Sequence, residues 1–278
     1  MMYLLICTAI LFASGYVVFR WIDSLDSDQK DDFKSGVNRF WERAEEKGHF
    51  KAIPGFELDC YRDYPRLKIL QDHYKEIAEE CDRLLELRDG MVQMQEIGGS
   101  YTSGDTHSLD WKTFMFKSGK FIEENCRHAP RTTDLLRKIP GVYTAFFSVL
   151  EPRQHIAPHW GYYKGFVRYH LGISIPYDNT NGECYIRVNS DPEVNRGRQF
   201  DRIGEGDIYY WKNGEGVVFD DTHMHEAFND SDRVRVVLFM DLRRSMPFYL
   251  QWLNWLFLFV AHNDGSVKSI RQNARFGA

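Results

Sequence analysis

The chain has 278 residues, enough to bury a full-sized hydrophobic core. Hydrophobic residues make up 43% of it and charged residues 27%, which excludes a chain that is disordered throughout. The net charge of −5 argues against a nucleic-acid partner, and the 5 cysteines include no Cys-x-x-Cys spacing, which argues against a zinc ribbon or a disulfide framework.

The first predicted element is a membrane anchor. Residues 3–19 contain no charged side chain and are followed by Arg20, so the run is just long enough for a spanning helix of about 17 residues. A cleaved signal peptide is the alternative, but it would need positive charge before the apolar run. We expect an uncleaved single-pass anchor over residues 1–22, with the rest of the chain facing the cytoplasm.

A juxtamembrane and helical region is predicted over residues 23–98. Within 27–47, aromatic and apolar residues recur at helical spacing until Gly48, so this helix either packs on its own domain or lies on a membrane surface. A second helix is predicted over 65–87, because Pro65 suits a first helical position and apolar residues then follow the 3.6-residue period.

The chain changes to a β-rich pattern after a short helix predicted at 131–138. Apolar runs of strand length recur, separated by turn residues, at 142–150, 166–175, 183–188, 207–211, 216–219 and 234–242. Many short strands joined by short turns predict a jelly roll, so the fold class is mainly β with flanking α-helices. We assign this domain to residues 99–245.

The C-terminal segment, residues 246–278, begins with a very apolar run that contains Trp252 and Trp255. The run at 248–261 is too short to span a bilayer comfortably. It forms either a buried helix or a helix that lies in the membrane interface, where tryptophan is favoured. A basic tail with Lys268, Arg271 and Arg275 follows.

Two pairs of histidine and arginine are the main candidates for a functional site. His159 and His225 are each followed, nine or ten residues later, by an arginine inside a β-branched run, Arg168 and Arg235. Imidazole is the commonest protein ligand for such divalent metals, and the guanidinium fork is the side chain that best clamps a carboxylate. The pattern therefore predicts a site that holds a divalent metal together with an organic dicarboxylate.

The usual third ligand of a non-haem iron site is a carboxylate two residues after the first histidine, and Gly161 occupies that position. Only two protein ligands would then hold the metal. If the empty ligand position faces the ion, Gly161→Asp should tighten metal binding. Asp220 and Asp221 are expected to be turn residues, and His223 either supports the site or is an incidental neighbour.

Further motifs surround these residues: Trp111-x-x-Phe114, Ser148, Pro158-His159-x-Gly161, Arg168-x-His170-Leu-Gly172, Phe219-Asp-Asp-Thr222 and His225-Glu226. In their order and spacing, residues 111–242 resemble the catalytic domain of the aspartyl/asparaginyl β-hydroxylase family of Fe(II)- and 2-oxoglutarate-dependent dioxygenases. The resemblance implies a cupin-like double-stranded β-helix that uses O₂. It also implies a catalytic pair of iron ligands, His159 and His225, and five residues that hold 2-oxoglutarate: Trp111, Ser148, Arg168, His170 and Arg235.

The resemblance leaves two substrate classes open. Gly161 favours the branch that hydroxylates aspartyl or asparaginyl side chains in peptides, because those enzymes also use two histidines. The predicted anchor, the tryptophan-rich segment and residues 164–170 favour the branch that hydroxylates the acyl chain of lipid A or an aminolipid. The peptide substrate is preferred at this point. Halogenation is a remote alternative, and a catalytically inactive, membrane-attached binding module is the alternative of a different class.

Overall fold

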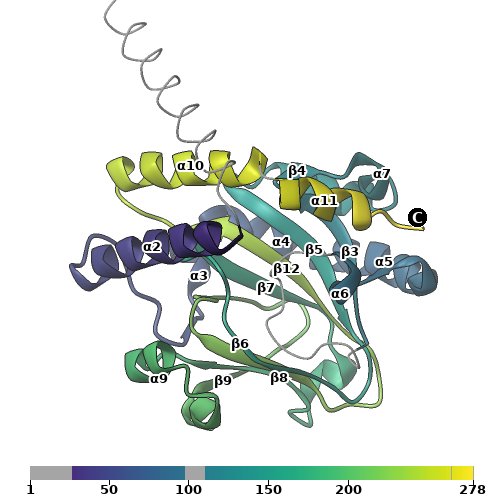
Figure 1. The fold of residues 1–278 in the computed structure, drawn as a ribbon. Coiled ribbons are helices and arrows are strands. Elements are labelled where there is room, and N and C mark those ends of the chain that lie inside the picture. The colour runs from purple at the N-terminus through teal and green to yellow at the C-terminus, as the bar shows by residue number, and fades with distance from the viewer. Residues whose placement is uncertain (1–26, 98–109, 264, 278) are drawn as a thin grey trace, which may run out of the picture.

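The structure, a computed structural model, describes residues 27–97, 110–263 and 265–277 (Figure 1). The predicted anchor at residues 1–22 lies outside this range. Among the helices that the described residues form, none combines the length and apolar character needed to cross a bilayer.

Two antiparallel sheets form the body of the protein. One sheet has the strand order β1-β10-β7-β12-β5-β3-β2, with β4 paired to β3, and the other has the order β6-β11-β8-β9. Strands β5 to β12 pass back and forth between the sheets, which is the arrangement of a jelly roll. The predicted mainly β jelly roll with flanking helices is confirmed, whereas the transmembrane helix of the same prediction falls on residues 1–22, outside the described range. The larger sheet contains β1 (Phe56–Glu57), β10 (Gly216–Phe219), β7 (Phe166–Ser174), β12 (Arg235–Arg243), β5 (Val142–Leu150), β3 (Trp111–Ser118), β2 (Val92–Gln93) and β4 (Lys120–Phe121), and the smaller contains β6 (Gln154–His159), β11 (Met224–Asn229), β8 (Cys184–Asn189) and β9 (Asp207–Tyr210).

Both faces of the larger sheet are covered. Successive side chains of each strand point to opposite faces, so each strand contributes apolar residues to both. One face packs on α5 (Tyr74–Leu85) and α8 (Pro130–Arg137), where Phe147 and Leu238 join the apolar residues of these helices. The opposite face packs on the smaller sheet, where Phe146 and Val237 meet Ile186. Strands β1 and β2 come from the predicted helical region, so that region and the β-rich body share one sheet.

The helix predicted at 27–47 is confirmed as α2 (Ser27–Glu46). The single helix predicted over 65–87 is wrong. The chain instead forms a 3₁₀ turn (Pro65–Leu67), α4 (Lys68–Asp72) and α5, with a break at His73, whose φ of −110° and ψ of 20° are not helical. The ring of His73 lies 2.6 Å from Glu76 and 3.1 Å from Arg131. No glycine or proline marks this break, so the residue pattern gave no sign of it.

Glu80 caps α8 from the neighbouring helix α5. Its buried carboxylate accepts hydrogen bonds from the backbone N–H groups of Arg131, at 2.9 Å, and Thr132, at 2.7 Å. We expect Glu80→Ala to lower the free energy of unfolding by about 1–3 kcal/mol, because it leaves buried donors at a helix N-terminus without acceptors. Urea denaturation measures this change. The exposed neighbour variant Glu79→Ala is the matched control, and an equal loss in both would contradict the capping role.

Two helices end the described chain, α10 (Phe248–Asn263) and α11 (Gly265–Asn273). One side of α10 packs on α2, where the rings of Trp41 and Phe257 lie 6.1 Å apart between centroids. Of the predicted basic tail, Arg271 donates a hydrogen bond to the Ser118 carbonyl at 3.0 Å and Arg275 pairs with Glu124 at 3.1 Å. These two arginines therefore contact the body of the protein.

Candidate active site

The two histidines face each other across neighbouring strands of the smaller sheet. His159 is the last residue of β6, His225 is the second residue of β11, and the two are direct partners in the strand register. Their ring centroids lie 4.1 Å apart, and both side chains are buried. The fold thus brings the two predicted metal ligands close enough to share one ion.

Backbone carbonyls fix the protonation of both rings. Nδ1 of His159 donates to the Ala157 carbonyl at 2.8 Å, and Nδ1 of His225 donates to the His223 carbonyl at 2.9 Å. Since a carbonyl oxygen only accepts, the lone pair of each ring is on Nε2, as a metal ligand requires. Burial lowers the pKa of His159 to about 4 and holds the pKa of His225 well below its usual value, so both rings are neutral. In the described ranges, no group of three or more His, Cys, Asp or Glu side chains has a metal-holding arrangement.

One cavity between the two sheets collects the whole predicted site. Its polar lining consists of the residues expected from the sequence, namely Trp111, Ser148, His159, Arg168, His170, His225 and Arg235. The rest of its wall is apolar and is formed by Met94, Phe146, Ile156, Ile186, Ala227 and Phe239. Residues far apart in the chain therefore meet in one place.

Arg235 is a buried cation that forms no ion pair with any carboxylate of the described residues. Its side chain is 1% exposed, its guanidinium carbon lies 4.5 Å from the centre of the Trp211 ring, and its Nε has no hydrogen-bond partner. Burial lowers its pKa to about 10. Burying an unpaired charge is costly, so this position suits an anionic ligand that would compensate the guanidinium.

Ser148 and His170 add neutral polar groups to the same cavity. The Ser148 hydroxyl accepts a hydrogen bond from Nε1 of Trp111 at 2.9 Å, which leaves its own proton available to a ligand. Both ring nitrogens of His170 are buried and have no partner in the described structure. Burial, followed by the nearby charges of Arg168 and Arg235, holds the pKa of His170 well below its usual value, so its ring is neutral.

Arg168 differs from Arg235, because protein carboxylates compensate it. Its Nε and Nη2 donate to Oδ1 of Asp241 at 3.1 and 3.0 Å, and its Nη2 lies 2.7 Å from Oδ2 of Asp221. Arg168 lines the cavity, but its guanidinium already has two anionic partners. A role in holding 2-oxoglutarate stays a prediction for this residue.

The expectation that Asp220 and Asp221 are simple turn residues is incomplete. Oδ1 of Asp220 does accept from the backbone N–H of Thr222 at 3.1 Å, as in a turn, but its Oδ2 pairs with Lys164 and Arg244 inside the protein. Asp221 is also buried; burial raises its pKa, while the guanidinium of Arg168 at 2.7 Å opposes the rise and favours the carboxylate. The signal that could have revealed both was two adjacent acids directly after the apolar strand β10.

The space beside Gly161 is occupied by Asp221. A Cβ atom on Gly161 would lie 1.8 Å from Oδ2 of Asp221, and the Gly161 N–H donates to the Asp221 carbonyl at 2.6 Å. An aspartate at position 161 would therefore clash with Asp221, so the expected gain in metal binding no longer follows.

We expect Gly161→Asp to destabilise the protein and to weaken iron retention. Overpacking alone costs about 1–3 kcal/mol, and a second buried carboxylate against Asp221 adds repulsion. Thermal unfolding and iron content of the purified protein measure the two effects. Gly204→Asp is the matched control, because nothing lies within 4 Å of the position of a Cβ there. A Gly161→Asp protein that is as stable as the control and holds more iron would refute the steric argument.

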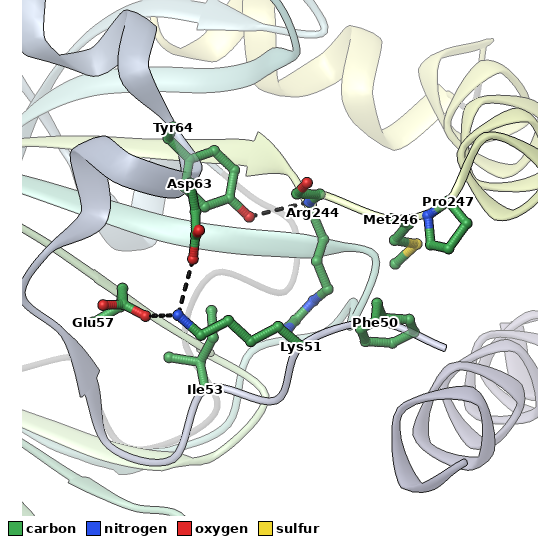
Figure 2. A pocket seen from close by; sticks show the side chains of 10 residues that line it. Phe50, Lys51, Ile53, Glu57, Asp63, Tyr64, Arg244, Met246 and Pro247 are labelled. Carbon is green, nitrogen blue, oxygen red and sulfur yellow. Dashed lines mark hydrogen bonds and ion pairs between the residues drawn. The ribbon is translucent and has the colours of Figure 1, made fainter. Parts of the chain in front are cut away.

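A second cavity lies away from the histidines, between the segment after α2, α3 (Cys60–Asp63) and the start of α10 (Figure 2). Lys51 there pairs with Glu57 and with Asp63. Arg244, also in its wall, pairs with Asp220. Because these charges are compensated within the protein, we assign no ligand to this cavity.

A jelly roll that holds two neutral imidazoles and an unpaired buried arginine in one cavity defines a candidate metal site with a place for an organic acid. Residues 71–245 match the family described as aspartyl/asparaginyl beta-hydroxylase. The chain belongs to this family of hydroxylases, and the resemblance predicted from its motifs is confirmed.

Two relatives represent different branches of the family. An ornithine lipid ester-linked acyl 2-hydroxylase from Rhizobium tropici is 31% identical over 201 residues, covering 71% of this chain and 64% of the relative. The human aspartyl/asparaginyl beta-hydroxylase is 25% identical over 232 residues, covering 75% of this chain and 28% of the relative. The chain thus spans less than two thirds of the length of either relative. A Pseudomonas putida prolyl-4-hydroxylase structure is 16% identical, with a TM-score of 0.39 over 63% of this chain and 87% of that one.

Proposed function

We propose that the protein is an Fe(II)- and 2-oxoglutarate-dependent hydroxylase. The observation that carries the proposal is the unpaired guanidinium of Arg235, buried in the same cavity as the two free Nε2 atoms of His159 and His225. The imidazoles suit a divalent metal, and the guanidinium with the Ser148 hydroxyl suits a carboxylate of the oxo acid. The residues present therefore fit both groups.

Iron and 2-oxoglutarate, when bound, supply with O₂ the oxidant that hydroxylates a carbon, and succinate and CO₂ are released. The protein's residues bind and orient. His159 and His225 would hold the metal, while Arg235, Ser148 and Trp111 would hold the far carboxylate. The neutral ring of His170 can donate or accept a hydrogen bond beside it. The apolar wall, which includes Phe146 and Phe239, keeps water away from the reacting atoms.

The test of this activity is spectroscopic. Under anaerobic conditions, Fe(II) and 2-oxoglutarate should together give a metal-to-ligand charge-transfer band that neither gives alone. Absence of the band in well-folded protein would reject the enzyme and favour the inactive binding module.

For the substrate, we favour the acyl chain of a membrane lipid over a peptide side chain. Gly161 still speaks for a peptide, because it leaves two histidines as the protein ligands, but the similarity to the relatives and the predicted anchor speak for a lipid. The Rhizobium lipid hydroxylase shares 31% of its aligned residues with this chain, and the human aspartyl/asparaginyl beta-hydroxylase shares 25%. The predicted anchor at residues 1–22 would also place the cavity near its lipid.

Hydroxylation of an aspartyl or asparaginyl side chain is the second candidate, supported by the human relative. Succinate release separates the two. Lipid extract should stimulate release above the uncoupled level, and an acidic peptide should not. Stimulation by the peptide alone would overturn the lipid assignment and leave the cofactor assignment intact.

A further inference from the structure

Helix α10 presents an aromatic stripe to solvent. The stripe consists of Phe248, Trp252, Trp255 and Phe259, which recur at helical spacing and are 42–86% exposed. From Phe248 to Phe259 the helix carries no charged side chain. Its other side is buried, since Leu250 joins the cluster formed by Val37, Trp41, Ala44 and Phe50. A continuous exposed apolar surface of this kind marks a contact with a membrane or another protein.

A groove with a cavity volume of about 330 Å³ runs beside the aromatic stripe, and its walls include Trp255, Leu258, Phe259, Tyr143 and Arg243. In the described chain, Arg243 forms no ion pair with a carboxylate. The groove therefore joins an aromatic wall to uncompensated positive charge, in a protein whose net charge is −5.

The course of the chain also places this surface near its N-terminal apolar run. The described chain starts with α2 at Ser27, and α2 packs on the buried side of α10. The uncharged residues 3–19 end only eight residues earlier in the sequence. Eight residues reach at most about 29 Å when fully extended. A bilayer that held residues 3–19 would thus lie close to the start of α2.

We propose that α10 lies on the surface of an anionic bilayer, with the aromatic stripe at headgroup depth and a lipid phosphate held in the groove by Arg243. Tryptophan and tyrosine favour the membrane interface, and basic side chains next to it attract anionic lipids. This inference goes beyond the proposed function, because it concerns a surface outside the active-site cavity and holds for either substrate.

The test uses the full chain reconstituted into phosphatidylcholine vesicles, with and without phosphatidylglycerol, that contain brominated lipid. The emission of the stripe is obtained by subtracting the spectrum of a Trp252→Phe/Trp255→Phe protein, which keeps the apolar surface. We expect this emission to be quenched by brominated lipid and protected from acrylamide in the water. Quenching should be stronger with phosphatidylglycerol, and an Arg243→Gln protein should lose that increment only.

The matched control is Phe200→Gln, which changes an aromatic residue that is 52% exposed and lies just after α9 (Pro192–Gly197), at the opposite end of the molecule from α10 (Figure 1). This variant should change neither the quenching by brominated lipid nor the quenching by acrylamide. Emission that acrylamide quenches as fully in vesicles as in detergent would overturn the proposal. Protection from both quenchers would overturn it too, since a second copy or residues 1–26 would then cover the stripe. The charge-transfer band, measured in the same samples, reports separately on the proposed function.

Discussion

Replacing either His159 or His225 by alanine is expected to abolish iron retention. With only two imidazoles at the site, a single substitution removes half of the protein's ligands. Loss of an outer-shell partner alone costs about 10–100-fold in metal affinity, so we expect the loss of a ligand to exceed about 100-fold. Metal analysis after gel filtration and anaerobic titration of the charge-transfer band measure the effect.

His128→Ala serves as the control for these variants, because His128 is exposed and lies outside the cavity. It should retain iron like the unmodified protein. Both active-site variants are expected to fold, since they remove neutral side chains, and circular dichroism checks this. Retention of iron by either single variant would show that another side chain, such as Asp221, binds the metal directly.

Arg235→Met and Arg168→Met are expected to differ in their effect on the free energy of unfolding. Arg235 has no carboxylate partner in the described structure, so its replacement should leave the free energy of unfolding without ligand unchanged or raise it. Arg168→Met should lower that free energy by about 3–5 kcal/mol, because Asp221 and Asp241 lose their buried partner.

Arg235→Met should instead lower the affinity for 2-oxoglutarate. Truncating one partner of a buried charge pair costs about 2–5 kcal/mol, so Arg235→Met should weaken 2-oxoglutarate binding by about 30-fold or more. Affinity for iron alone should change little. Titrating the band with 2-oxoglutarate at saturating Fe(II) gives the affinity, and urea denaturation gives the stability. Equal losses of iron and 2-oxoglutarate affinity would contradict the assigned role of Arg235.

Much of the fold was predictable from the sequence, because buried strands appear in it as apolar runs. The strand predicted at 142–150 coincides with β5, and that at 216–219 with β10. The strands that carry the two histidines were not predicted. β6 has the sequence Gln-His-Ile-Ala-Pro-His and β11 has Met-His-Glu-Ala-Phe-Asn, so polar groups interrupt the apolar pattern in each. A binding site needs such polar residues, and strands that contain them cannot be predicted from a continuous apolar run.

The candidate site was predictable residue by residue, but its electrostatics were not. The resemblance of its motifs to the β-hydroxylase family selected the seven polar residues that line the cavity. It did not reveal that Arg168 is compensated by Asp221 and Asp241 while Arg235 is left unpaired, because those partners come from separate strands and turns. It also did not show that Asp221 fills the space beside Gly161, which depends on how two loops meet in three dimensions.

The neighbouring acids Asp220 and Asp221 connect the N-terminal helix to the cavity. Asp221 holds Arg168 in the cavity wall, while Asp220 pairs with Lys164 and Arg244, both of which also reach Glu45 of α2. A shortened protein prepared for crystallisation should therefore begin no later than Ser27. Deleting α2 would remove Glu45, the counter-charge of the buried Lys164 and Arg244, and would expose Trp41. Because Asp220 is bonded directly to Asp221, the change would also disturb Arg168 in the wall of the candidate metal site.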